Sequence, residues 1–533
     1  MAALFNHVPV AAQPIGAFDN QKVLTRILRA LVSNAFSQAL VLLLNLLLVP
    51  VFFSHWSIRK YGEWLVLSSV VAYLAALDSG MQMAAVNRLT QLYALEKFED
   101  YRRIQHAAMV FYIFMAAIGT ALLFAITFML PVPRLLGIRE IPIQEVRLCL
   151  IFLGLQVVWS IPLGLVTAIY RSTGRVATAQ WIGNARQVIS GFGTFVILLL
   201  GRGPREIALY QLLVLLAIAA GCLVDVNLRF PNLRLGVQGF TWKGLRELFA
   251  PSFMFFLIMV GNVISIQGPP VLISSLLGGV AVAEFVTCRS LVSYGKQITS
   301  ILTNSAWTDL TRMEAMEHTD RLHIFHRLFV GVTCAVSIGF NVLMAVEGFH
   351  IVKIWSGGKI IASTSLLVAL SVFALLQTNW QTVSFVCVSS NRHSRVSLCT
   401  VLSSAVGIAL MSVGLRHFGL VAVPLAMVLS EGLVCYHFVI ADACHSMNLS
   451  YPRFAFQLWS STLLATALSG GVAGLLAWHF AAASLAEIFL IGICTESIAF
   501  AVMWLKFLRP PDRMFAMERI TRSVRLRPAG QVG

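Results

Sequence analysis

The sequence predicts an all-α integral membrane protein with about 14 transmembrane helices. Only 12% of its residues are charged and 58% are hydrophobic, and its mean hydropathy is +0.81. A soluble domain carries about 25% charged residues, so a surface this poor in charge requires lipid as its solvent. Apolar runs of about 20 residues recur throughout the chain, and each can cross about 30 Å of hydrocarbon. No room is left for a folded domain outside the bilayer.

The apolar runs define the expected helices in chain order. Their boundaries are 31–54, 63–87, 107–131, 147–170, 188–201, 207–228, 250–276, 281–308, 328–346, 363–388, 396–415, 420–441, 459–480 and 486–507. The short fifth helix is expected to begin earlier, near Gln180. In the seventh, Gly268-Pro269-Pro270 suggests a kink, because proline lacks the N–H that continues a helix.

Basic residues predict how the helices are oriented. The chain has 39 Lys and Arg against 23 Asp and Glu, which gives a net charge of +16. Most of these cations fall in segments that face the cytoplasm if both termini are cytoplasmic, in agreement with the positive-inside rule. We therefore expect a multi-pass protein of the cell inner membrane. Nucleic-acid binding is not expected, because no soluble domain is present to carry a basic patch.

The two terminal segments are expected to lie outside the helices. In residues 1–30, basic side chains precede an apolar run that is too long for a cleavable signal peptide, so this run is expected to act as a signal anchor. The basic tail at 509–533 is expected to remain unfolded near anionic lipid headgroups.

Two parts of the chain match at an offset of 220 or 221 residues. The matched stretches are Phe152–Trp159 with Phe373–Trp380, Arg175 with Arg395, Pro50 with Pro270, and Glu63 with Glu284. The repeated unit holds six helices, and an even number makes both copies enter the membrane in the same sense. We expect two parallel six-helix lobes plus two C-terminal helices. Glu63 and Glu284 begin the second helix of each lobe, where the helix dipole favours them as caps.

This repeat divides the chain into six segments. They are the cytoplasmic N-terminal segment 1–30, the N-lobe 31–228, a cytoplasmic inter-lobe linker 229–249, the C-lobe 250–441, the added helices 459–508 and the basic cytoplasmic tail 509–533. Two lobes with a cleft between them form the architecture of an alternating-access transporter, with its site where the lobes meet.

No catalytic residue, metal site or cofactor is expected. Eight of the nine cysteines lie in apolar runs and no CxxC pair occurs, so the cysteines are expected to pack as small apolar side chains. The sequence contains no HExxH, GxSxG or Walker A motif, and ATP hydrolysis is therefore not expected.

Arg289 and Lys296 give the strongest indication of function. They lie seven residues apart in the eighth expected helix, on one face and about 10 Å apart along its axis, with Ser293 between them. A cation inside the bilayer costs at least a few kcal/mol and normally faces a cavity or a partner. The pair predicts an anion site in the cleft, with snorkelling or a structural ion pair as the alternative. Ser68 and Ala75 occupy the matching positions of the first lobe, which predicts a chemically one-sided site.

Asp78 is the main acidic residue expected within the membrane. Three roles are open for it: pairing with a cavity cation, taking up a proton as a coupling site, or capping a helix that bends at Gly80.

Polar side chains accompany these charges on two other helices. Asn34 and Gln38 share a face of the first helix, and Gln377 and Gln381 share a face of the tenth. Such faces either bond neighbouring helices or line a wet cavity. The expected substrate-binding set is Arg289, Lys296, Ser293, Asp78, Asn34, Gln38, Gln377 and Gln381.

Short motifs in the first two helices resemble a known family. They are Asn34, Pro50, Tyr61-Gly62-Glu63-Trp64, Tyr73-Leu74, Leu77-Asp78-Ser79-Gly80 and Asn87-Arg88. This pattern resembles the polysaccharide-export branch of the multidrug/oligosaccharidyl-lipid/polysaccharide exporter superfamily, the Wzx-type O-antigen flippases. The motifs cover about the first ninety residues, and the six-plus-six repeat with two extra helices fits the rest in outline.

The resemblance implies a transporter that flips undecaprenyl-pyrophosphate-linked oligosaccharide from the cytoplasmic to the periplasmic leaflet without ATP. Such transport serves the biosynthesis of O-antigen lipopolysaccharide or exopolysaccharide. Arg289 and Lys296 would receive the pyrophosphate or acidic sugars, and Asp78 matches the family's Asp-x-Gly position. The implied partners are the lipid-linked oligosaccharide, the phospholipid bilayer and polysaccharide polymerase or assembly proteins, and a monomer is expected.

Elementary energetics agree with this implication. A sugar–pyrophosphate headgroup cannot cross hydrocarbon unaided, because each bare polar group costs several kcal/mol. A polar cleft between two lobes removes that barrier, while the lipid tail stays in the bilayer.

Three alternatives remain open at this point. A multidrug or cation antiporter of the same superfamily would prefer acidic and aromatic residues in its cavity, which the two cations disfavour. A membrane polysaccharide polymerase or ligase needs catalytic residues on a substantial periplasmic loop, and the expected outer loops are short. A non-transporting scaffold has no need of a buried charged face.

Overall fold

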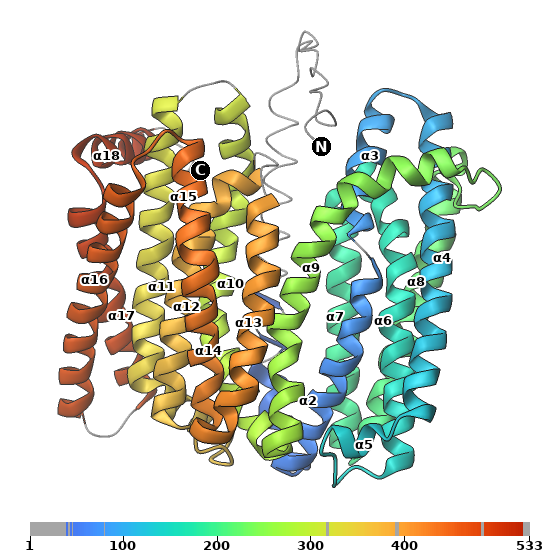
Figure 1. Ribbon diagram of the computed structural model, residues 1–533, viewed down its shortest axis with the longest axis horizontal. Helices are drawn as coiled ribbons and strands as arrows, with labels where there is room; N and C mark the ends of the chain where they lie inside the picture. The colour runs from blue at the N-terminus through green and yellow to red at the C-terminus, as the bar shows by residue number, and fades with distance from the viewer. Residues whose placement is uncertain are drawn as a thin grey trace, which may run out of the picture.

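All the elements that the computed structural model describes are helices. It describes residues 39–40, 43–44, 46–78, 80–315, 319–389, 394–480 and 484–525. Within these residues the long helices run side by side in two bundles, as Figure 1 shows. The predicted all-α membrane fold is confirmed.

The described part of the N-lobe begins with a helix that ends at His55. Its elements are α2 (Ile58–Ala72), η2 (Tyr73–Asp78), α3 (Met81–Ala94), α4 (Phe98–Met129), α5 (Val132–Leu135), α6 (Ile143–Ser172), α7 (Val176–Leu199) and α8 (Pro204–Arg229). The C-lobe and the added helices follow. Their elements are η3 (Pro231–Leu233), α9 (Trp242–Leu277), α10 (Gly279–Ala315), α11 (Thr319–Trp355), α12 (Thr364–Ser389), α13 (Ser394–Phe418), η4 (Gly419–Val421), α14 (Ala422–Glu431), η5 (Gly432–Tyr436), α15 (His437–Ser446), α16 (Tyr451–Phe480), α17 (Leu485–Val502), η6 (Met503–Phe507) and α18 (Pro510–Arg525).

Among the described residues, ten helical stretches are long and apolar enough to cross a membrane. One of them, 394–446, covers two of the expected helices, and the first half of the first expected helix lies largely outside the described residues. Helix α10, which carries Arg289 and Lys296, is not among the ten. The count of fourteen spans therefore stays a prediction.

The second expected helix, 63–87, is broken rather than continuous. Helix α2 ends at Ala72, the 3-10 turns of η2 follow, and α3 begins at Met81. Gly80 precedes α3 with φ 66°, a left-handed conformation that only a residue without Cβ adopts easily. The helix thus bends at Gly80, as one of the three roles open for Asp78 assumes.

The internal repeat is visible in the register of the helices. Helices α2 and α10 begin at Ile58 and Gly279, and α6 and α12 begin at Ile143 and Thr364, so both pairs are separated by 221 residues. This separation equals one of the two offsets, 220 and 221 residues, found between the matched stretches of the sequence.

Glu63 does not cap its own helix, contrary to expectation. Its fully buried carboxylate accepts backbone N–H bonds of 2.8–3.1 Å from Arg139, Glu140 and Ile141, which precede α6. Glu284 accepts the backbone N–H of Ser363 at 3.2 Å in the same way before α12. Each carboxylate thus ties a helical hairpin to the next helix through charge-assisted hydrogen bonds, a role that sequence spacing alone does not show.

One end of the molecule joins the two lobes. At the end that holds α5 and residues 356–363, here called the α5 end, one cluster of buried apolar side chains includes Phe53 and Leu67 of the N-lobe with Phe285 and Leu291 of the C-lobe. The backbones of α2 and α10 touch there, and Gly62 leaves no room for a Cβ against Gly279.

Hydrogen bonds between the lobes reinforce the α5 end. The Trp355 indole donates to the Leu46 carbonyl at 2.9 Å, and the Lys359 ammonium bonds the carbonyl of Phe53. Toward the opposite end, which holds α18 and is here called the tail end, the apolar clusters of the two lobes are separate. The lobes are therefore joined at the α5 end and keep separate cores at the tail end.

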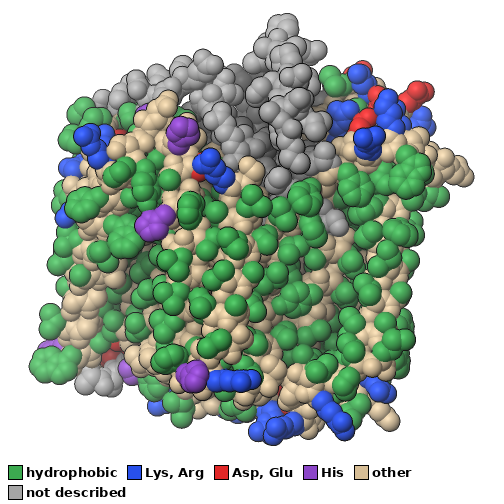
Figure 2. Space-filling model, in the orientation of Figure 1, with side chains coloured by type: hydrophobic (Ala, Val, Ile, Leu, Met, Phe, Trp, Pro, Cys, Tyr) green, Lys and Arg blue, Asp and Glu red, His purple; other side chains and the backbone are tan. Residues whose placement is uncertain are grey.

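The outer surface suits a lipid environment. Figure 2 shows hydrophobic side chains over the middle of the visible face, with Lys and Arg gathered near its two ends. Many large apolar side chains in the middle of the helices are exposed, among them Phe192, Leu213 and Leu433. Such exposure is expected where acyl chains replace water as the solvent.

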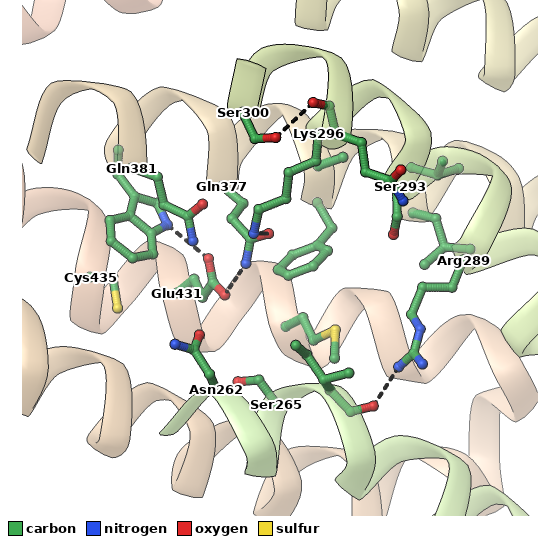
Figure 3. A pocket seen from close by; sticks show the side chains of 18 of the residues that line it. Asn262, Ser265, Arg289, Ser293, Lys296, Ser300, Gln377, Gln381, Glu431 and Cys435 are labelled. Atoms are coloured by element: carbon green, nitrogen blue, oxygen red, sulfur yellow. Dashed lines mark hydrogen bonds between the residues drawn. The ribbon is translucent and has the colours of Figure 1, made fainter. Parts of the chain in front are cut away.

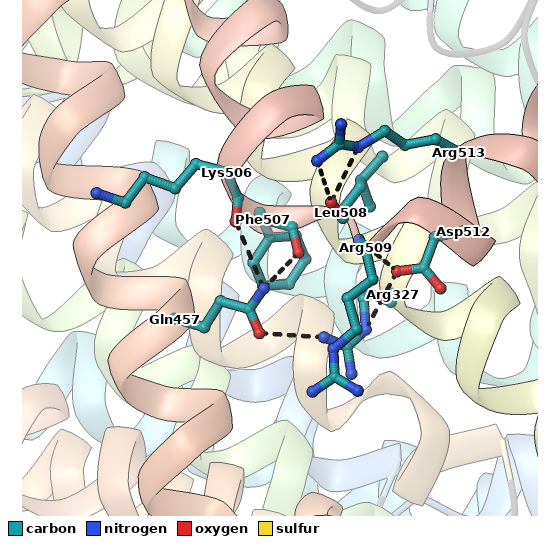
Figure 4. A network of polar contacts seen from close by, with 8 residues as sticks. All are labelled: Arg327, Gln457, Lys506, Phe507, Leu508, Arg509, Asp512 and Arg513. Atoms are coloured by element: carbon teal, nitrogen blue, oxygen red, sulfur yellow. Dashed lines mark hydrogen bonds and ion pairs between the residues drawn. The ribbon is translucent and has the colours of Figure 1, made fainter.

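The C-terminal tail folds in part, contrary to expectation. Helix α18 lies at the tail end, and its Asp512 pairs with Arg327 of α11 at 3.4 Å, with both side chains 5% exposed (Figure 4). Asp512 also caps α18 by accepting the Arg509 N–H at 2.8 Å. Arg327 is bonded further to Gln457 of α16, so three helices meet at this ion pair.

Breaking this ion pair will destabilise the tail end. In Asp512→Ala the Arg327 charge stays buried without its partner, and we expect a loss of about 3–5 kcal/mol in the stability of the folded protein. The measurement is thermal unfolding of the purified protein in detergent. Asp442→Ala is the matched control, because Asp442 pairs with an exposed Arg395, and such pairs contribute about 0–1 kcal/mol. Equal melting temperatures for the two variants would contradict the assignment.

Candidate functional site

A cavity of about 490 Å³ with both polar and apolar lining lies within the C-lobe. Helices α9, α10, α12, α13 and α14 enclose it, together with Cys435 of η5 (Figure 3). Its polar and charged lining consists of Asn262, Ser265, Arg289, Ser290, Ser293, Lys296, Gln297, Ser300, Gln377, Gln381, Thr400, Ser403 and Glu431. Phe373, Tyr294 and Trp380 add aromatic surface.

One face of α10 supplies both cations of the cavity. Arg289, Ser293, Lys296 and Ser300 recur every three or four residues, so a helix presents them in a row. The structure thus brings together Arg289, Ser293 and Lys296 as the sequence spacing predicts. Lys296 is exposed and Arg289 is half-buried, although both lie well inside a long helix. This exposure is to the cavity.

Proline in α9 explains the position of Arg289. Pro270 has no N–H, so the carbonyl of Ile266, four residues earlier, lacks its helical donor. The Arg289 guanidinium donates to this carbonyl at 2.7 Å and lies 5.3 Å from the centre of the Phe285 ring. Among the described residues Arg289 forms no ion pair with a carboxylate, so its charge remains available to an anion.

Lys296 belongs to a chain of three polar groups. Its ammonium donates to Gln377 Oε1 at 2.9 Å, and Gln377 Nε2 donates to Glu431 Oε1 at 2.8 Å. The Trp380 indole donates to the other carboxylate oxygen at 2.8 Å. The amide therefore separates the ammonium from the carboxylate, and the two charges compensate each other without direct contact.

Glu431 is the residue that sequence reasoning missed. It ends α14 and is 6% exposed. The side chains of Glu431 and of Cys435, four residues later in the π-helix η5, both line the cavity. An acid in the middle of the expected helix 420–441 was a detectable indication, because ionisable residues inside the bilayer are rare.

Of the other expected site residues, Gln377 and Gln381 line the cavity. Asp78 does not, because it lies in the N-lobe at the break before α3, where Tyr112 and the Gln82 backbone face it. Its Oδ1 is buried without a hydrogen-bond partner, so it does not pair with a cavity cation. Asn34 and Gln38 lie outside the described residues.

Among the described residues, helices of the C-lobe line this cavity, whereas the sequence predicts a site where the lobes meet. The chemical asymmetry of the repeat gives the reason, because only the C-lobe copy carries Arg289 and Lys296. No group of three or more His, Cys, Asp or Glu in the described part of the chain has the arrangement of a metal site. The cavity offers one uncompensated cation, one compensated ion pair, and many hydroxyl and amide groups.

Solved structures share this fold. An inward-facing multidrug resistance MATE family transporter of the MOP superfamily matches with a TM-score of 0.66 at 12% identity, over 77% of this chain and 94% of that chain. The lipid II flippase MurJ in an inward closed conformation matches with a TM-score of 0.63 at 14% identity, over 90% and 99%. A MOP superfamily transporter from Pyrococcus furiosus matches with a TM-score of 0.57 at 12% identity, over 79% and 95%.

The chain has the fold of these transporters. At 12–14% identity the likeness concerns the fold alone. No protein-family model and no curated protein matches the sequence. The MATE transporter also matches in an outward-facing conformation, with a TM-score of 0.57 against 0.66 for the inward-facing one.

Water must reach the cavity if it receives a charged ligand. We expect Ser293→Cys to react with a hydrophilic maleimide added to the detergent-solubilised protein, above the background of the native cysteines, most of which are buried. The control is Ser337→Cys, because Ser337 is 2% exposed within the C-lobe and has no route to water. Labelling of both variants at equal rates, or of neither, would show that the cavity is not wet.

Proposed function

We propose that this chain is a flippase for a lipid-linked oligosaccharide carried on undecaprenyl pyrophosphate. It moves the headgroup from the cytoplasmic to the periplasmic leaflet of the cell inner membrane by alternating access, during the biosynthesis of O-antigen or another surface polysaccharide. Both termini and the tail end then face the cytoplasm, and the α5 end faces the periplasm.

The observation that carries this proposal is the charge of the cavity. Arg289 has only a neutral carbonyl as its hydrogen-bond partner, and Lys296 uses one donor on Gln377. A lysine ammonium has three donors and a guanidinium five, so both groups keep donors for a diphosphate. Charge-assisted hydrogen bonds from Arg and Lys to phosphate are among the stronger polar contacts in proteins.

The remaining lining suits the sugars. Hydroxyl and amide groups such as Asn262, Ser300 and Gln381 offer both donors and acceptors, as sugar hydroxyls require. The Phe373 and Trp380 side chains offer flat apolar surface beside them. The lipid tail needs no cavity, because it can remain in the bilayer next to the protein.

A multidrug or cation antiporter is the second candidate. Two observations favour it: the acidic Glu431 with aromatic neighbours in the cavity, and the MATE transporter's TM-score of 0.66. Against it stands the net positive charge of the lining. The flippase MurJ also covers 90% of this chain, compared with 77% for the MATE transporter, which supports the flippase proposal. A polysaccharide polymerase or ligase is the weakest candidate, because the connections at the α5 end are short.

Removing the cavity cations will stop transport without unfolding the protein. We expect Arg289→Gln/Lys296→Gln to weaken diphosphate binding by about ten- to hundredfold for each lost charge-assisted bond of about 1.5–3 kcal/mol. The measurement is the rate at which proteoliposomes flip a fluorescent undecaprenyl-pyrophosphate oligosaccharide. The matched control is Arg416→Gln, an exposed cation at the end of α13. Wild-type flipping by the double variant would rule out this cavity as the substrate site, and selective export of cationic dyes by the wild type would favour the antiporter.

A further inference from the structure

The ionised form of Glu431 depends on the positive charge of Lys296, which an anionic substrate would also bind. Its carboxylate is 6% exposed and accepts hydrogen bonds from two neutral groups, the Gln377 amide and the Trp380 indole. A buried carboxylate needs a compensating positive charge, or it takes up a proton. Lys296 supplies that charge from the far side of the Gln377 amide.

Few other ionisable groups surround Glu431. On α10 the cavity holds Lys296, the Tyr294 phenol and, about two turns from Lys296, Arg289. On η5 it holds the Cys435 thiol, which lies near Cys399 of α13. The parts of α9, α12 and α13 that line the cavity present neutral groups, namely Asn262, Ser265, Gln377, Gln381, Trp380, Thr400 and Ser403. Lys296 is therefore the cation on which the ionised state of Glu431 rests.

An anion bound to Lys296 changes this balance. The ammonium faces the cavity with two unused donors, and a diphosphate that accepts from them places at least two negative charges beside the amide. The Lys296 charge is then shared between the ligand and Glu431. Arg289 adds one positive charge to the ligand but is too distant to compensate the carboxylate.

We propose that Glu431 takes up one proton when an anion binds Lys296, so that the ligand of this site is the anion together with a proton. The inference rests on the proposed function, because it assumes an anionic substrate in this cavity. An O–H bond forms on Glu431 Oε1 as a hydronium ion in the water of the cavity gives up a proton, and one O–H bond of that ion breaks. The reverse transfer returns the proton to water when the anion leaves.

The Gln377 amide can form a hydrogen bond with both the ionised and the protonated form of Glu431. While Glu431 is ionised, Nε2 donates to the carboxylate and Oε1 accepts from Lys296. Once Glu431 is protonated, its O–H becomes a donor, and the amide turns over so that Oε1 accepts from it and Nε2 faces the anion. Trp380 donates to the second oxygen in both states. The turn gives the anion one more donor at the moment it binds.

Calorimetry tests this linkage directly. Farnesyl diphosphate is titrated into the purified protein at pH 7.5 in buffers of different ionisation enthalpy, which yields the number of protons taken up per ligand bound. We expect the wild type to take up about one proton more than Glu431→Gln, because a neutral glutamine imitates the protonated acid and leaves nothing to titrate. Glu431→Gln should bind at least as tightly as the wild type, and comparing the two cancels the probe's own protonation.

The possible outcomes separate this inference from the proposed function. Equal proton uptake by the wild type and Glu431→Gln would overturn the inference alone, and so would loss of binding by a Glu431→Gln protein that melts like the wild type. Absence of farnesyl diphosphate binding to the wild type would overturn the anion site itself. The control is Glu496→Gln, since Glu496 is a half-buried acid in α17 outside the cavity, and its proton uptake should equal the wild-type value. A loss of uptake in that variant would place the proton elsewhere and refute the inference.

Discussion

The structure depends on how charge is held within a bilayer, where water is not available to solvate it. Among the described residues, the two cavity cations of α10 are each stabilised by a neutral dipole instead of a direct ion pair: Arg289 by the Ile266 carbonyl that Pro270 leaves free, and Lys296 by the Gln377 amide. Such partners hold the side chains in place without consuming their charge. A direct carboxylate contact would compete with any anionic ligand, whereas a carbonyl or amide leaves the remaining donors available.

The way the two lobes are joined determines which contacts must separate during transport. Carboxylates tie the hairpins of each lobe together, through the buried Glu63 before α6 and the half-buried Glu284 before α12. The α5 end has one apolar core for both lobes, while the tail end has separate ones. Transport by alternating access would require the common core to part at the α5 end, where Gly62 and Gly279 now bring two helix backbones into contact.

The sequence predicted the lipid-embedded helices, the repeat offset and the polar face of α10, because each follows from composition or from helical periodicity. Glu431 was not predicted as a site residue, although it lies in the middle of an expected helix, because its partners Gln377 and Trp380 are distant in the sequence and only the fold brings them close. The helix-capping role predicted for Glu63 was wrong for a related reason: its partners lie 76–78 residues away, and only the fold brings them close. The fold of α18 depends on Arg327, which no local pattern connects to Asp512.

The central claim is that the cations of α10 receive the anionic group of the substrate. The most direct measurement is a structure of the purified protein with an undecaprenyl-pyrophosphate oligosaccharide bound. The account predicts diphosphate density between Arg289 and Lys296, within hydrogen-bonding distance of both, with the sugars along α12. Density for the diphosphate at another site, with the cavity of α9, α10, α12, α13 and α14 holding only water, would contradict it.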